Sequence, residues 1–193
     1  MRLLKPRIEP LDLDRLDEAQ REVLAPLANP DNKVGGGKVL NIFRTLAHTP
    51  KALTGFLNWG NYVLSRRNSL GARERELVIL RTGWICRSGY EFAQHKRIGL
   101  VCGLTEDEIE RVKQGPDAEG WSPIEAAMLR ATDELVSDHF VSDESWAVLE
   151  ELGDKARMDL VFTVGQYTQV SMMLNSFGVQ LEEGDAPDPD LCS

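Results

Sequence analysis

Apolar residues recur along this chain at spacings of three and four, which is the pattern of helices that each bury one face. No stretch shows the sustained alternation of apolar and polar residues that is typical of a half-buried strand. The pattern therefore predicts an all-α protein. With their caps included, the expected helices span residues 13–27, 41–47, 49–66, 72–84, 90–102, 105–114, 122–139, 143–152 and 154–177.

Several of these helices are expected to begin at recognisable caps. Residues 105–108 and 122–125 each place a hydroxyl side chain three positions before a glutamate, which is the reciprocal capping-box pattern. Thr49 is followed by a proline at the first helical position, and Asp154 precedes the longest helix. That longest helix is apolar nearly all round, as expected for a helix in the core or at a subunit interface.

The chain is expected to form a single helical domain over residues 1–181, since neither an internal repeat nor a second-domain boundary is visible. Residues 29–38, which include three consecutive glycines, are expected to form a loop. Residues 182–193 are acidic and contain two prolines, so we expect this tail to be disordered.

Charge and hydropathy narrow the range of partners. The 193 residues carry a formal net charge of −9, which argues against nucleic acid or an anionic membrane as the main partner. No apolar run reaches the roughly 18 residues that a membrane span needs. The first residues also lack the apolar core of a signal peptide. We therefore expect a cytoplasmic protein.

The segment between residues 73 and 95 gathers ionisable side chains inside an otherwise apolar stretch. Glu91 and His95 are four positions apart, so on a helix they share one face and can form a hydrogen bond. A glutamate that orients a histidine is a common acid–base pair in catalysis. Burying such groups costs several kcal/mol unless they are paired, so their presence here calls for a partner or a function.

Three runs of this region, residues 73–81, 90–95 and 103–109, resemble the carboxymuconolactone decarboxylase family, whose all-helical fold is shared with the AhpD-like alkylhydroperoxidases. Shorter runs in the C-terminal half look like the same family: residues 121–125, 133–135 and 165–167. The resemblance extends over roughly residues 40–179. It implies an AhpD-like helical bundle that assembles into homo-oligomers, as trimers or hexamers, with sites near subunit interfaces.

The chain departs from the redox-active branch of that family, which carries a Cys-x-x-Cys-x-x-x-His motif. Counting back from His95, the two cysteine positions hold Ser88 and Glu91. The nearest alternative pair, Cys86 and Cys102, is separated by ~24 Å along a continuous helix, whereas a disulfide needs Cα atoms within about 7 Å. We therefore expect no two-cysteine peroxidase reaction. The odd count of three cysteines, without metal-ligand spacing, indicates neither a disulfide framework nor a zinc site.

The resemblance places the catalytic residues at His95, Glu91 and Glu76. His95 is the expected proton donor, Glu91 orients it, and Glu76 tunes or relays a proton from the preceding helix. Two structural alternatives remain open. Glu91 and His95 could be a satisfied polar pair that fixes a helix crossing or a subunit contact, and Glu76 could form an exposed ion pair with Arg73 or Arg75.

Five further residues are candidates for binding a substrate. Tyr90 could donate a hydrogen bond to a substrate oxygen, and Ser88 lies beside the expected site by position. Arg73 and Arg81 have the fork geometry that clamps a carboxylate, although a solvated charge or an internal salt bridge is the commoner role. Cys86 could be a lone reactive thiol, but a free cysteine is more often a small buried hydrophobe.

These observations predict a cofactor-independent lyase of the carboxymuconolactone decarboxylase type. It would act by proton transfer on a small carboxylated lactone or carbonyl compound. A metal site is not expected, because the family is not generally metal-dependent and the segment offers a single histidine. Two alternatives remain: a peroxidase-like protein that uses Cys86 with an external thiol, and a non-catalytic oligomer that binds a small ligand.

Overall fold

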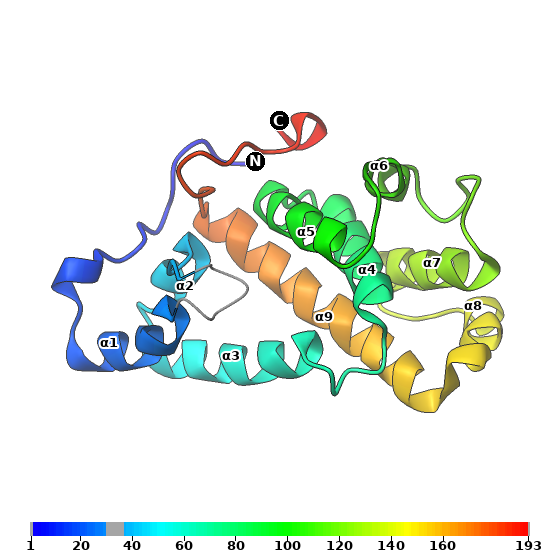
Figure 1. Ribbon diagram of the computed structural model, residues 1–193, viewed down its shortest axis with the longest axis horizontal. Helices are drawn as coiled ribbons and strands as arrows, with labels where there is room; N and C mark the ends of the chain where they lie inside the picture. Colours follow the sequence, from blue (N-terminus) through cyan, green and yellow to red (C-terminus); the bar gives the residue numbers. More distant parts are fainter. Residues whose placement is uncertain (1, 30–36, 193) are drawn as a thin grey trace.

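The computed structural model describes residues 2–29 and 37–192, and those residues contain helices, turns and loops but no strand. The all-α prediction is therefore confirmed. In chain order the elements are η1 (Leu13–Arg15), α1 (Glu18–Leu24), η2 (Ala25–Ala28), α2 (Asn41–Leu46), α3 (Pro50–Leu64), α4 (Ala72–Ile85), α5 (Gly89–Val101), α6 (Glu106–Gln114), α7 (Pro123–Ser137), α8 (Asp143–Val148), η3 (Leu149–Leu152), α9 (Gly153–Phe177) and η4 (Pro189–Leu191), where η marks a 3₁₀ helix (Figure 1). None of these helices combines the length and the apolar character that crossing a membrane requires.

The capping boxes at the starts of α6 and α7 are confirmed, because each hydroxyl accepts from a backbone N–H and each glutamate bonds back to the cap. Other boundaries differ from the prediction. The first helix is broken into η1, α1 and η2, since Asp17 caps a new helix. Asp154 lies inside α9 rather than at its cap. Most of the predicted glycine-rich loop, residues 30–36, falls outside the described residues.

The C-terminal tail differs from the expected disordered segment, since residues 182–192 are packed against α5 and α6. Lys113 of α6 lies 2.8 Å from a carboxylate oxygen of Asp188 and 2.9 Å from one of Asp190. Leu191 of η4 is buried in the main hydrophobic cluster. Local composition indicated disorder because the tail's cationic and apolar partners lie far away in the sequence.

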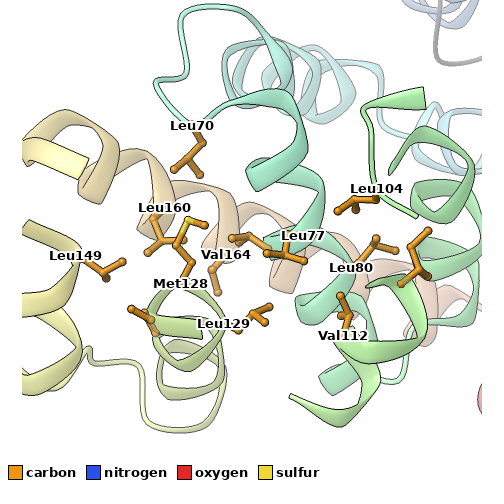
Figure 2. Packing of buried hydrophobic residues seen from close by; sticks show 14 of the residues in the cluster. Leu70, Leu77, Leu80, Leu104, Val112, Met128, Leu129, Leu149, Leu160 and Val164 are labelled. Atoms are coloured by element: carbon orange, nitrogen blue, oxygen red, sulfur yellow. The ribbon is translucent and has the colours of Figure 1, made fainter. Parts of the chain in front are cut away.

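Helix α4 lies at the centre of the protein and packs against α5, α6, α7 and α9. Its four consecutive apolar residues, 77–80, are all fully buried. Leu77 and Leu80 join Met128 of α7 and Val164 of α9 in the main cluster (Figure 2). Ile79 instead faces a second cluster, whose other members come largely from α2, α3, α5 and α9. A helix buried on all sides can hold a polar side chain only if a neighbour supplies a partner.

Two glycines let α4 and α5 approach closely. A Cβ atom added at Gly83 of α4 would lie 3.3 Å from Cγ of Glu91. One added at Gly99 of α5 would lie 3.0 Å from Leu104 and 3.8 Å from Cβ of Glu76. The missing side chains therefore bring the backbones together at the positions where the polar residues of the two helices face each other.

We expect Gly83→Val to destabilise the protein by about 1–3 kcal/mol, because the new methyl groups overpack the α4–α5 contact. The matched control is Gly165→Val in the middle of α9, where an added Cβ meets nothing within 4 Å. It should change the free energy of unfolding by less than about 0.5 kcal/mol. Urea denaturation of both variants measures the difference, and equal effects would contradict the close-approach role of Gly83.

Candidate active site

A histidine between two carboxylates forms the polar centre of the α4–α5 contact. Nδ1 of His95 lies 2.6 Å from Oε2 of Glu76, and Nε2 lies 3.1 Å from Oε1 of Glu91. Glu76 comes from α4, whereas Glu91 and His95 lie one turn apart on α5. The structure thus brings together the three residues that the sequence singled out as catalytic. It places Glu76 in the interior beside His95 and not in an exposed ion pair.

All three side chains are withdrawn from solvent: the exposed fractions of these residues are 1% for Glu76, 3% for Glu91 and 7% for His95. Burial alone lowers the pKa of His95, but the two carboxylates outweigh it and raise the pKa to about 10. At neutral pH the ring is therefore an imidazolium, and both of its nitrogens carry protons. With two carboxylates beside it, the group holds one net negative charge.

Glu91 and His95 also line a cavity of about 150 Å³ between α2, α3, α5 and α9. An apolar cavity of roughly this size holds a single ring such as benzene in another protein. Much of its wall is apolar: Leu40, Ile42, Phe43, Phe56, Leu64 and Val170. Glu76 does not line it, so it contacts a ligand only through His95.

Other polar side chains at the cavity belong to Asn61, Tyr90, Gln94, Gln166 and Tyr167. The Tyr167 ring meets the His95 ring edge-on, with 4.9 Å between centroids. The tail's Glu182 accepts a hydrogen bond from the Tyr90 hydroxyl at 2.8 Å and one from Gln94 Nε2 at 2.7 Å. Of these residues only Tyr90 was a sequence candidate. Gln94 lies within residues 73–95, the segment that the sequence analysis singled out. Nothing in the sequence around Glu182 indicated that it would contact these residues.

Both tyrosine hydroxyls remain protonated. Burial, followed by the charge and hydrogen bond of Glu182, raises the pKa of Tyr90 far above its ordinary value. Burial, followed by the charges of Glu91 and Glu76, raises the pKa of Tyr167 well above its ordinary value. The Tyr167 hydroxyl is therefore available as a donor rather than as an anion.

The two arginine candidates do not line the cavity. Arg73 forms ion pairs with Glu108 of α6 and Glu125 of α7. Arg81 binds both carboxylate oxygens of Asp133, at 2.6 and 2.7 Å, and donates to backbone carbonyls at the end of α6. Each guanidinium is thus occupied by internal partners, which was the commoner role weighed from the sequence.

Ser88 and Cys86 also lie away from the lining of the cavity. Ser88 is fully buried, and its hydroxyl has no hydrogen-bond partner among the described residues. Burial raises the pKa of the Cys86 thiol, which disfavours the reactive thiolate. Across residues 2–29 and 37–192, no group of three or more His, Cys, Asp and Glu side chains has an arrangement suited to a metal ion.

Solved proteins of low sequence identity share this fold. A peroxidase-related protein from Ralstonia eutropha JMP134 with an alkylhydroperoxidase AhpD core is 20% identical, with a TM-score of 0.78 over 92% of this chain and 93% of its own. A peroxidase-related protein from Silicibacter sp. TM1040 is 16% identical, with a TM-score of 0.76 over 98% and 97%. The debrominase Bmp8, solved with 2,3,4-tribromopyrrole, is 11% identical, with a TM-score of 0.74 over 93% and 94%. The fold is therefore AhpD-like.

The sequence comparison agrees with the fold. Residues 50–134, from the start of α3 into α7, match the carboxymuconolactone decarboxylase family. This match and the shared AhpD-like fold both support the resemblance to the carboxymuconolactone decarboxylase family that is seen in the motifs of the chain. Among curated proteins, none matches the sequence.

The His95 ring is expected to titrate near pH 10, and Glu76→Gln should lower this pKa because it removes one of the two charges that raise it. Ring C–H chemical shifts followed by NMR from pH 5 to 11 measure both values. Glu150→Gln, at an exposed position in η3, serves as the control and should leave the titration unchanged. A wild-type midpoint near the ordinary value of 6.5 would show that the three groups do not act as a charged unit.

Peroxide at neutral pH is expected to leave Cys86 largely unmodified, because burial keeps its thiol protonated. The exposed Cys192 provides an internal comparison in the same molecule. Treatment with peroxide and dimedone, followed by peptide mass spectrometry, should detect more sulfenic adduct at Cys192 than at Cys86. Preferential modification of Cys86 would instead support the one-cysteine peroxidase alternative.

Proposed function

We propose that this protein is a cofactor-independent enzyme that moves a proton on a small carbonyl compound or lactone. The observation that carries the proposal is the group of Glu76, His95 and Glu91, two of whose members face an apolar cavity. An acid and a base at the wall of a small, mostly apolar cavity are the components that general acid–base catalysis requires.

The geometry favours a distinct role for each residue. Glu76 makes the shorter contact, 2.6 Å to Nδ1, and fixes the orientation of the His95 ring from the side away from the cavity. Glu91 makes the longer contact, 3.1 Å, and lines the cavity itself. We therefore assign Glu76 as the positioning residue, Glu91 as the base and the His95 imidazolium as the hydrogen-bond donor that stabilises the developing oxyanion.

These roles describe a complete proton transfer. The Glu91 carboxylate takes a proton from the carbon next to the substrate carbonyl, and the electron pair of that C–H bond moves onto the carbonyl oxygen. The resulting enolate is stabilised by hydrogen bonds from the His95 Nε2–H and the Tyr167 hydroxyl. Glu91 then returns a proton to carbon, either the one it took or one that it has exchanged with solvent, and this restores the carbonyl group and the starting charges.

The size of the cavity supports a single-ring substrate. A structural neighbour with the same fold, the debrominase Bmp8, was solved with 2,3,4-tribromopyrrole, which is itself a single ring. The family also includes proteins named for decarboxylation of a lactone. Loss of CO₂ from a carbon next to a carbonyl leaves the same enolate, so that chemistry needs the same stabilising groups.

We further propose that the protein is a homo-oligomer. The resemblance to the family supports this, and the exposed apolar side chains of Trp59 on α3 and of Met158 and Met172 on α9 are candidate contact positions. None of these three residues lines the cavity.

The proposal is tested by incubating simple cyclic ketones and lactones in deuterated water and following exchange at the carbon next to the carbonyl by NMR. The wild-type protein is expected to speed this exchange for at least one compound. Glu91→Gln and His95→Gln should each lower the rate by roughly 10²- to 10⁴-fold, because the first removes the base and the second removes the cation that stabilises the enolate.

Glu150→Gln, at an exposed position, is the matched control and should exchange at the wild-type rate. Circular dichroism establishes that each variant is folded. If folded Glu91→Gln and His95→Gln catalyse exchange as fast as the wild type, the assignment of these residues is wrong.

A further inference from the structure

We infer that the cavity selects uncharged single-ring carbonyl compounds and rejects carboxylates, including the carboxylated lactones that the sequence suggested. This inference rests on the proposed function, because it names the class of substrate for the same site. The inference follows from two negatively charged features next to the cavity, the buried group around His95 and the carboxylate of Glu182 in the tail.

The first negative side is the group of Glu76, His95 and Glu91, two of whose members line the cavity. Glu76 and Glu91 supply two buried carboxylates, and the His95 imidazolium supplies one positive charge between them. The sum is one negative charge, close to the ligand and screened little by water. A bound carboxylate would be repelled by Glu91 directly and would gain at most one hydrogen bond from His95.

The second negative side is formed by the tail. Both oxygens of Glu182 accept hydrogen bonds from side chains that line the cavity, Tyr90 and Gln94. One oxygen also accepts from the backbone N–H of Asn41, at 2.8 Å. The donors of Tyr90 and Gln94 are therefore directed towards Glu182 and not towards a ligand anion.

No arginine or lysine among the described residues lines the cavity. Arg73 and Arg81 are held by internal carboxylates of α6 and α7, and Arg97 pairs with Asp185 of the tail at 2.8 Å. Arg75 lies near enough to lower the pKa of Tyr167, but the effects of Glu91 and Glu76 on that hydroxyl are larger. The arginine side chains thus do not neutralise the carboxylates that lie near a bound ligand.

An uncharged carbonyl compound suits the same surroundings. Its ring packs on the apolar wall, and its oxygen can accept from His95 Nε2–H or from the protonated hydroxyl of Tyr167. No charge needs to leave water when such a ligand binds. The cavity therefore favours a lactone or cyclic ketone whose acidic groups, if any, are masked as an ester or amide.

The test compares two ligands that differ only in charge, 5-oxotetrahydrofuran-2-carboxamide and 5-oxotetrahydrofuran-2-carboxylate. At pH 7, isothermal titration calorimetry should give a dissociation constant at least about tenfold lower for the carboxamide, as expected for one uncompensated charge. Glu91→Gln and, separately, Glu182→Gln should narrow this ratio. The exposed control Glu150→Gln should leave it unchanged.

Equal or tighter binding of the carboxylate by the wild type would overturn the inference, and so would the absence of binding by both compounds. Because Glu91→Gln could disturb the buried group, Glu182→Gln provides a second variant whose charge lies outside it. The deuterium-exchange experiment separates the two proposals. Exchange of the carboxylate as fast as the carboxamide refutes the selectivity alone, whereas selective binding without exchange refutes the proton-transfer function alone.

Discussion

The buried contact of one imidazolium with two carboxylates, across α4 and α5, is the constraint on which the rest of the structure depends. Taking these ions out of water costs several kcal/mol for each, and only their mutual attraction offsets it. The contact therefore requires that the two helices lie close together and in one register. Gly83 and Gly99 provide the closeness, and Glu76 lies seven positions before Gly83, on the same face of α4.

The arginines of α4 have a different electrostatic role. Arg73 and Arg81 bind carboxylates of α6 and α7, so they attach α4 to the right-hand half of the molecule in Figure 1. In a chain with a net charge of −9, these cations are needed to hold acidic helices together. Charged residues of α4 thus serve two different contacts, with arginines that bind α6 and α7 and a glutamate that binds His95 of α5.

The sequence predicted the features that depend on neighbours in the chain. The helical spacing, the capping boxes at Thr105 and Ser122, and the one-turn pairing of Glu91 with His95 are all local, and the structure contains each of them. The contact of Glu76 with His95 spans nineteen positions and was expected only through the family resemblance.

Other features depend on partners that no local pattern reveals. Arg81 could equally have bound a ligand or Asp133, because the same fork of donors serves both. Glu182 belonged to a segment whose acidic composition indicates disorder, yet it bonds to Tyr90 and Gln94 about ninety positions earlier. Hydrogen bonds of such long range are set by the packing of α5 and α9, which sequence periodicity does not specify.

Glu91 affects the protonation of two neighbouring side chains, the Cys86 thiol and the His95 ring. It occupies one of the two places where the redox branch of the family carries cysteine, so it removes a thiol from the site. Burial is the main cause of the raised pKa of the nearby Cys86 thiol, and the charge of Glu91 raises that pKa further. The same carboxylate helps to keep His95 protonated. One residue therefore opposes thiolate formation and favours an imidazolium acid, so the change from thiol to carboxylate alters the chemistry of the whole site.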